Sequence, residues 1–297
     1  MNRPVVIEAA INGVTSPEHN AAVPRLPEEI AQDALACFEA GAAIVHSHTH
    51  DPVRPPDEAA ALYAEAYTRV LEALPDAILY PTMGVGDTIQ ARWNHHLPLA
   101  AEGLIRCAAL DTGSVNLGAS LPDGRPMRID FVYTNSPNNI RTMMEECERL
   151  GLGPSTAIFE PGFLRVVLAA HAKGALPAGT LVKFYFSAGG YLGGGEPLFS
   201  APPIPEALEL YLAMLGDAAL PWAVAVLGGS LLDSPIADLA LERGGHLRVG
   251  LEDHLDGPPN AEQVAAAARR CAKFGRPVAS PGEAAALLGL PPLTGAS

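Results

Sequence analysis

The chain has 297 residues, a mass of 30.9 kDa and a formal net charge of −14. Its hydrophobic fraction of 48% and mean hydropathy of +0.17 exclude a disordered chain and supply enough apolar residues for a core. The excess of Asp and Glu argues against a nucleic-acid partner, because Lys and Arg supply most of the affinity for a phosphate backbone. It does not exclude small anions, which need only one local cation or metal ion.

The first residues and the cysteines indicate a reduced, cytoplasmic protein. The opening MNRPVVIEAAING reaches Asn-Gly after one short apolar run, unlike a secretory leader. No stretch approaches the roughly 20 apolar residues that cross a membrane, so we expect no membrane partner. The cysteines are far apart and without CxxC spacing, and we expect reduced thiols at Cys37, Cys107, Cys147 and Cys271.

Short apolar runs alternate with longer amphipathic segments along the whole chain. Strands are predicted at Val5–Ile11, Ala43–His48, Ala77–Thr82, Cys107–Leu110, Thr156–Phe159, Val182–Phe186, Ala223–Leu227 and His246–Leu251. Helices are predicted at Pro27–Glu39, Asp57–Leu74, Trp93–Glu102, Ile140–Leu150, Phe163–Lys173, Pro205–Leu215, Pro235–Glu242, Ala261–Phe274 and Gly282–Leu288.

Eight strand–helix alternations with almost continuously apolar strands predict an α/β fold with a buried parallel sheet. The strand count and the length favour a (β/α)₈ TIM barrel, a single domain over residues 1–297, above an open doubly wound sheet. We expect a long loop at Thr112–Asn135, extended backbone at Phe131–Tyr133, and a C-terminal tail over about 289–297. Asn260 is the expected N-cap of the helix that follows it.

Functional residues of such a barrel lie at the C-terminal ends of the strands and in the loops that follow. The second strand ends in AIVHSHTHD, and His46 and His48 point to the same face of it. Their Cα atoms are expected about 6.5 Å apart, so the two imidazoles can converge on one metal ion. A pair of hydrogen-bonded core histidines is the alternative. His50 continues the alternation, but Asp51-Pro52 follows it, so it is a weaker candidate ligand.

The eighth strand reads GGHLRVGLEDH and places acidic residues at its end. Glu252 can complete a His₂Glu ligand set that leaves a coordination position open for a substrate. Asp253 is a candidate base, and Arg248 can orient it or neutralise developing charge. A solvated acidic loop is the alternative for both carboxylates.

Weaker signals follow two other strands. The Thr82 hydroxyl and the amides of Gly84 and Gly86 could bind a carboxylate, although an ordinary glycine turn explains them equally well. Ser114 and Asn116 offer similar polar groups after the fourth strand. There is no P-loop, no GxGxxG opening a helix and no GxSxG elbow, so nucleotide-dependent and serine-hydrolase functions have no support.

These motifs resemble those of the β-keto acid cleavage enzymes, a zinc-dependent (β/α)₈ family that includes 3-keto-5-aminohexanoate cleavage enzyme. The resemblance covers nearly the whole chain: AAINGV, PEEIAQDALACFEAGAAIVHSHTHDP, LDTGSVNLG, WAVAVLG, GGHLRVGLED and NAEQVAAAARRCAKFGRPVASPGEA. The HxH and RxGxED signatures, in this order and on the expected strands, are specific when taken together.

The resemblance implies roles for individual residues. His46, His48 and Glu252 match the zinc ligands, Arg248 and Asp253 match the catalytic pair, and Thr82 matches a contact to the substrate carboxylate. It implies a Claisen-type exchange in which a β-keto acid and acetyl-CoA give acetoacetate and a new acyl-CoA. It also implies a homo-oligomer, a tetramer in this family.

Four positions depart from the family pattern. His50 replaces an arginine, Ala157 a glutamate, Ala109 a hydroxyl residue and Gly229 the arginine of a Gly-Arg pair. These positions surround the metal ligands, so the choice of substrate and the use of acetyl-CoA are open. The alternatives are a metal-dependent aldolase or hydrolase without CoA, and a barrel that keeps a metal for structure or sensing.

Overall fold

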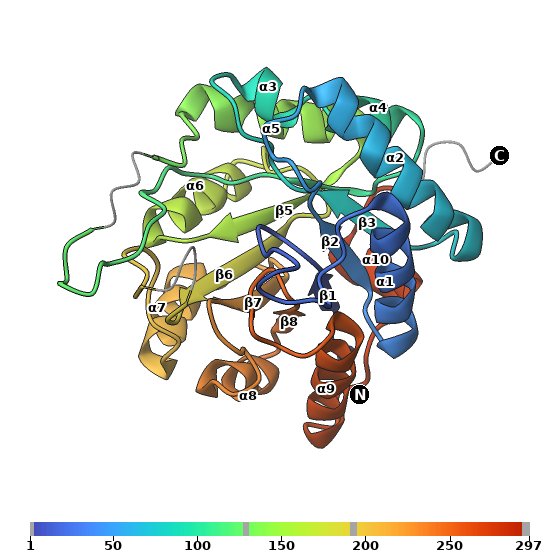
Figure 1. Cartoon of the computed structure of the whole chain (residues 1–297). Helices are drawn as coiled ribbons and strands as arrows, with labels where there is room; N and C mark the ends of the chain where they lie inside the picture. The colour runs from blue at the N-terminus through green and yellow to red at the C-terminus, as the bar shows by residue number, and fades with distance from the viewer. Residues whose placement is uncertain (1–2, 127–130, 191–194, 293–297) are drawn as a thin grey trace.

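Eight parallel strands lie at the centre of the molecule, surrounded by helices (Figure 1). The computed structural model describes residues 3–126, 131–190 and 195–292. The strands are β1 (Ile7–Ala10), β2 (Ile44–Ser47), β3 (Ile78–Pro81), β4 (Cys107–Ala109), β5 (Gly153–Ile158), β6 (Leu181–Ser187), β7 (Trp222–Leu227) and β8 (His246–Val249). The predicted TIM barrel, a single domain, is confirmed.

Helices follow every strand in the chain and cover the outside of the barrel. They are α1 (Pro27–Ala40), α2 (Pro56–Ala73), α3 (Ile89–Trp93), α4 (His96–Ala101), α5 (Pro137–Leu150), α6 (Pro161–His171), α7 (Pro205–Leu215), α8 (Pro235–Glu242), α9 (Asn260–Lys273) and α10 (Pro281–Leu288). Proline at the first position of most of them costs no hydrogen bond, because that N–H has no partner within the helix.

The hydrogen-bonded strand order is β3-β2-β1-β8-β7-β6-β5-β4. Its two end strands, β3 and β4, contact each other, and the Arg106 amide donates to the Leu79 carbonyl at 3.4 Å. The described residues contain no strand pairing between β3 and β4. The barrel is therefore nearly closed, with a seam between β3 and β4.

Alternation along each strand separates two apolar layers. Outward residues such as Val224 and Leu247 pack against the helices. Inward residues near the N-terminal ends, among them Ile44 and Ala223, pack against Ala284 and Leu288 of α10. Helix α10 therefore seals the N-terminal end of the barrel, and the polar groups are left for the opposite end.

Some element boundaries differ from the prediction. The helix predicted at Trp93–Glu102 is two short helices, since Pro98 has no N–H to donate to the Asn94 carbonyl. Asn260 is not an N-cap: Pro259 holds that position, and the Asn260 side chain instead donates to the Ile11 carbonyl and accepts from the Leu251 amide.

The long loop and the tail are described in part. Val115 and Tyr133 form an antiparallel bridge, so the expected extended backbone is present at Tyr133. Residues 127–130 of the loop and 293–297 of the tail lie outside the described residues. Leu290, placed in the tail by the prediction, is buried. No described helix is long and apolar enough to cross a membrane.

Candidate metal centre

His46 and His48 come from the C-terminal end of β2 and face the barrel interior. The His46 Nδ1 lies 3.2 Å from the carbonyl oxygen of Tyr80 on β3, and its ring stacks on the Tyr80 ring with centroids 4.4 Å apart. The His48 amide donates to the Asn12 side chain at 2.8 Å, just after β1. Tyr80 thus fixes the His46 ring, and Asn12 fixes the backbone of His48.

Glu252 lies in the turn after β8, and two glycines bring it close to β1. Its amide donates to the Ala10 carbonyl at 3.1 Å. Gly250 has φ +141°, and a Cβ there would lie 2.1 Å from the same carbonyl oxygen. Gly13 has φ +55°, and its Cβ would lie 2.4 Å from the Glu252 Cγ. Neither position accepts a side chain without displacing the carboxylate.

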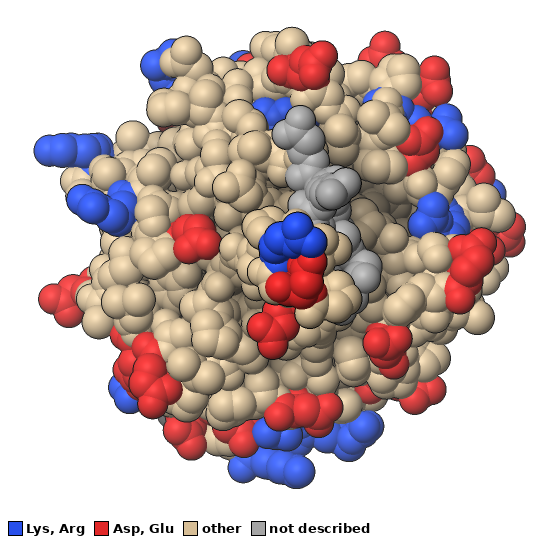
Figure 2. All heavy atoms as spheres, turned by 60° about the vertical axis from the view of Figure 1, so that its left-hand side comes forward, with Lys and Arg blue, Asp and Glu red and all other residues tan. Residues whose placement is uncertain are grey.

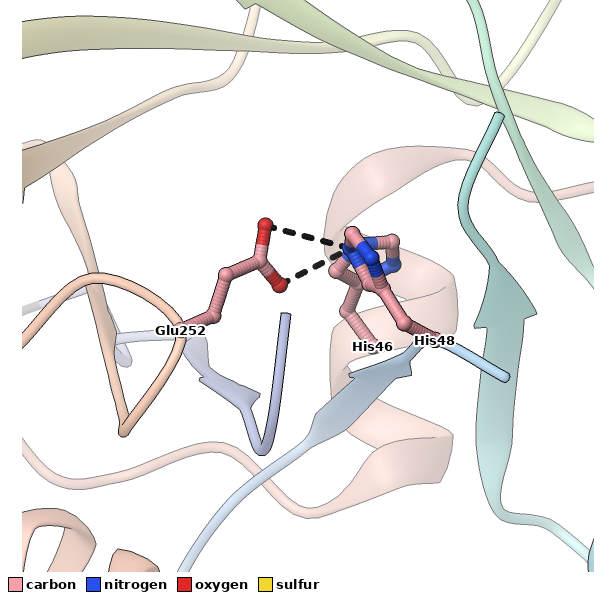
Figure 3. Close-up of side chains that lie close together, drawn as sticks. All are labelled: His46, His48 and Glu252. Carbon is pink, nitrogen blue, oxygen red and sulfur yellow. Dashed lines mark hydrogen bonds and ion pairs between the residues drawn. The ribbon is translucent and has the colours of Figure 1, made fainter. Parts of the chain in front are cut away.

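The three side chains converge (Figure 3). His46 Nε2 lies 3.2 Å from His48 Nε2 and 3.4 Å from Glu252 Oε2, and His48 Nε2 lies 3.3 Å from Glu252 Oε1. One ligand atom from each residue falls within a group no more than 4.8 Å across. The structure therefore brings together the three residues predicted as metal ligands.

The donor set fits a divalent ion. Because the Tyr80 carbonyl can only accept, His46 Nδ1 carries the proton and the Nε2 lone pair points into the cluster. Glu252 Oε2 is buried and has no hydrogen-bond partner among the described residues. The unpaired carboxylate oxygen and the nitrogen lone pair repel each other. A cation bound between them would replace this repulsion with two attractive contacts. Two imidazoles and one carboxylate are ligands that Zn²⁺ accepts.

Arg248 links this cluster to Asp253. Its Nη2 lies 2.8 Å from Glu252 Oε1, while Nε and Nη2 donate to the two Asp253 oxygens at 2.9 and 3.1 Å. Arg248 and Asp253 are 1% and 2% exposed. The guanidinium therefore holds both carboxylates in fixed positions on one side of the imidazoles.

Burial and charge set the protonation states. Burial lowers the pKa of His46 well below its usual range, which keeps the ring neutral. Burial alone would raise the pKa of Glu252, but Arg248 and the two histidines hold it well below its usual range. Burial raises the pKa of Asp253 to about 6, against the opposing effect of Arg248.

A second charged group lies beneath the metal centre, and the sequence reasoning missed it. Glu8 Oε1 accepts from Arg248 Nη1 at 2.7 Å, from Lys183 Nζ at 3.0 Å and from the Tyr80 hydroxyl at 2.6 Å. Lys183 Nζ also lies 2.7 Å from that hydroxyl. We call Glu8, Tyr80 and Lys183 the buried network. The sequence does carry a signal for this network: Glu8 in VVIEAAI and Lys183 in LVKFYF are charged residues inside apolar strands. A buried charge needs a partner, so each of them predicts an ion pair inside the barrel.

The predicted carboxylate contacts near β3 are only partly available. Thr82 follows Tyr80 by two residues and is half-buried, and its hydroxyl has no hydrogen-bond partner among the described residues. The Gly84 amide donates to the Arg92 carbonyl at 2.8 Å and is not free to bind a carboxylate. Among the described residues, the Thr82 hydroxyl and the amide of exposed Gly86 are the predicted groups left without a hydrogen-bond partner.

The other candidates lie apart from the metal ligands. Ser114 is exposed, and its hydroxyl accepts from the Asn135 amide and donates to the Asn135 carbonyl, which holds the loop together. Asn116 is also exposed. His50 pairs with Arg54 at 3.1 Å and makes no contact with the cluster in the described chain.

Apolar side chains occupy the wall opposite the charged one. Ala157 belongs to a cluster with Tyr185, Phe199, Ala225 and Leu227, and Phe159 packs against it. Ala109 is buried on β4. At Gly229, a Cβ would lie 2.9 Å from that of Ala188. Two of the departures from the family pattern, Ala109 and Ala157, thus lie among mostly apolar side chains, although the Ala157 amide donates to the buried Asp111 carboxylate at 3.1 Å.

The surface matches the acidic composition. Figure 2 shows acidic side chains scattered over the visible face and basic ones interspersed, with no continuous basic surface. The mixture of charges on this face is in keeping with the formal net charge of −14.

Comparison with known proteins decides the family. Residues 4–290 match the profile of the beta-keto acid cleavage enzymes. The chain belongs to this family. It is therefore an enzyme of the beta-keto acid cleavage family, and the resemblance noted from its motifs is confirmed.

Relatives of this family member share about a third of its residues. It is 30% identical over 295 residues to a 3-keto-5-aminohexanoate cleavage enzyme of Acetoanaerobium sticklandii, covering 96% of this chain and 98% of the relative. It is 31% identical over 305 residues to a 3-oxoadipate:acetyl-CoA acetyltransferase of Cupriavidus necator, covering 98% and 96%.

Solved structures support the fold alone. Apo ObcA superposes with a TM-score of 0.66 at 18% identity, covering 91% of this chain but only 66% of the ObcA chain. A type I 3-dehydroquinate dehydratase of Clostridium difficile gives a TM-score of 0.52 at 10% identity, covering 90% and 92%.

Proposed function

We propose that this enzyme is a zinc-dependent β-keto acid cleavage enzyme that uses acetyl-CoA. One molecule of β-keto acid and one of acetyl-CoA give acetoacetate and the new acyl-CoA, so carbon, sulfur and protons balance. The observation that carries the proposal is the direct bond between Arg248 and both the candidate ligand Glu252 and the candidate base Asp253. A metal site with a purely structural role does not need a base such as Asp253 beside it.

Each residue has a task in the exchange. His46, His48 and Glu252 would hold a divalent ion, which supplies Lewis acidity toward a keto acid and its enolate. Asp253 accepts the proton from C2, through an oxygen lone pair that Arg248 leaves unused. Arg248 keeps that carboxylate oriented and offsets the negative charge that develops beside it. Thr82 is the proposed contact to the substrate carboxylate, with Ser114 and Asn116 as further polar contacts.

Names of the relatives support acetyl-CoA as the second substrate. One is a 3-oxoadipate:acetyl-CoA acetyltransferase and another, from Rhizobium meliloti, a 3-dehydrocarnitine:acetyl-CoA trimethylamine transferase, 28% identical over 276 residues. The two names contain different keto acids, 3-oxoadipate and 3-dehydrocarnitine, so the family relationship alone does not select the substrate. A tetramer is part of the same proposal, and light scattering on the purified protein tests it.

The experiment supplies metal-loaded protein with acetyl-CoA and a panel of β-keto acids, and mass spectrometry follows acetoacetate and acyl-CoA. We expect turnover that is lost on chelation and in Asp253→Asn, but kept in Asp256→Asn, which changes an exposed carboxylate nearby. Metal-dependent cleavage that does not need acetyl-CoA would replace the proposal with an aldolase or hydrolase. No turnover across the panel would leave a metal-binding barrel.

A further inference from the structure

A groove of about 410 Å³ lies outside β7 and β8, between the loop that precedes α8 and one face of α9. We call it the α9 groove. Its inner end reaches Arg248 and Asp253, the pair beside the candidate metal ligands. No role assigned so far to these residues uses a cavity on this side.

The groove extends along α9. Gln263, Ala266, Arg270 and Lys273 all line it, and their spacing of three and four residues places them on one helix face. Ten residues of helix span roughly 15 Å. The groove is therefore long and narrow, and it connects the candidate base with the far end of the helix.

The character of the lining changes along this length. Near Asp253 the walls include Val226, Val249 and the backbone of Gly229 and Gly250. At the far end the lining carries three cations, Arg269, Arg270 and Lys273, in a chain whose net charge is −14. Asp233, which acts on Arg270, and His254 also line the groove.

Two of these cations are unpaired. Arg270 is held by Asp238, with Nε and Nη2 donating to its two carboxylate oxygens. Arg269 and Lys273 are exposed and make no ion pair with any described residue. Basic residues near the end of a helix offset its dipole, but that effect does not require a cavity beside them. These two cations are free to bind an anion that enters the groove.

We propose that the α9 groove binds the coenzyme A arm of the thioester substrate. The neutral pantetheine arm lies along the inner walls with its sulfur toward Asp253, and the phosphates of the nucleotide end bind Arg269 and Lys273. The assignment rests on the proposed function. At the inner end Arg248 is fully engaged by Asp253, Glu252 and Glu8, so the unpaired cations of the groove lie at the end away from the candidate base. A long ligand with a neutral arm and an anionic end matches this arrangement.

Direct binding separates this inference from the proposed function. Calorimetry with the metal-loaded wild type compares CoA, dephospho-CoA, pantetheine and adenosine 3′,5′-bisphosphate. We expect CoA to bind tightest, because it contacts both ends of the groove. Equal affinity for pantetheine and CoA would overturn the phosphate contacts. Equal affinity for the bisphosphate and CoA would overturn the binding of the arm.

Variants locate the contact. Arg269→Gln/Lys273→Gln should weaken CoA binding and raise the KM for acetyl-CoA at least about 10-fold, because two charged contacts to phosphate are lost. Acetyl-pantetheine, which has no nucleotide end, should be unaffected. The matched control Arg165→Gln/Lys173→Gln removes the same charge from exposed positions in and after α6. Metal content and unfolding midpoint verify that each variant is folded.

Ala266→Phe tests the path itself. A ring midway along α9 should raise the KM for acetyl-pantetheine as well as for acetyl-CoA. If wild-type enzyme uses acetyl-CoA and none of these variants differs from the control, the groove assignment is wrong and the proposed function stands. If CoA binds and the groove variants weaken that binding, but no exchange occurs, the assignment stands and the proposed function is wrong.

Discussion

Around β1, β2 and β8 the barrel interior carries charged side chains that bond to one another, whereas around β5, β6 and β7 it carries mostly aromatic and aliphatic ones. Lys183 of β6 is the charged residue that reaches across, to Glu8. Directional bonds hold the charged wall in place, and a buried charge that loses its partner is costly. Side-chain packing contributes most to the apolar wall, and packing tolerates exchanges of similar volume. We infer that the chemistry depends on the first wall and that substrate choice can vary on the second.

The largest effect is expected from substitutions of the metal ligands at the centre of the charged wall. His46→Ala or His48→Ala should lose bound metal and lower the turnover at least about 100-fold, because two ligands do not hold the ion. Elemental analysis of the purified variants checks it. His171→Ala, at the exposed end of α6, is the control. Stoichiometric metal in either ligand variant would refute the ligand assignment.

The buried network tests whether pairing stabilises the charged wall. Glu8→Gln leaves Lys183 without its carboxylate and should lower the free energy of unfolding by about 3–5 kcal/mol. Lys183→Met should cost less, because Glu8 keeps its bond to Arg248. Urea unfolding measures both. If Lys183→Met proved the more damaging, the Glu8–Arg248 bond would not compensate as argued.

A substitution at Gly13 adds bulk next to Glu252 and so perturbs the charged wall without altering a charge. Gly13→Ala should lower the free energy of unfolding by about 2–3 kcal/mol, combining positive-φ strain with overpacking, and should weaken metal binding by displacing Glu252. Gly103→Ala separates the two causes, since Gly103 has φ +71° and no neighbour within 4 Å. Equal losses in both variants would mean that contact with Glu252 contributes nothing.

Replacing Asp33 should give the smallest change in the free energy of unfolding, and this change should be a gain in stability. Burial raises the pKa of Asp33 to about 6, and Asn260 donates to its carboxylate, which forms no ion pair with any described residue. Because the folded state favours the protonated acid, stability falls as pH rises from about 4 to about 6. Asp33→Asn should therefore stabilise the protein by about 1–2 kcal/mol at pH 7 and not at pH 4.

Thermal unfolding at the two pH values measures the difference. Exposed Asp217 supplies the control, Asp217→Asn, for which no pH-dependent gain is expected. A gain for Asp33→Asn that persisted unchanged at pH 4 would show that its cause is not ionisation.

Local patterns were enough to predict the strands and to select His46, His48 and Glu252 for a metal centre. Each of these signals lies within a few residues of sequence. The buried network could not be predicted, because Glu8 is 240 residues from Arg248 and 175 from Lys183, and pairing at such separations depends on the closed barrel. Gly84 was misjudged for a similar reason: whether an amide is free depends on its partner, here in α3.

The seam between β3 and β4 has a consequence for motion. Strands paired on both sides exchange their amide hydrogens only when the sheet opens, whereas each seam strand has one unpaired edge in the described structure. Deuterium should therefore enter β3 and β4 before β1 or β8, where Glu8 and Arg248 lie. Local opening would begin at β3, beside Thr82, and would loosen the contacts that Tyr80 makes with Glu8 and His46, while β1 and β8 stay paired on both sides. A barrel opened at the seam would behave as an open sheet in which β2, the strand of His46 and His48, is the second strand from the β3 edge.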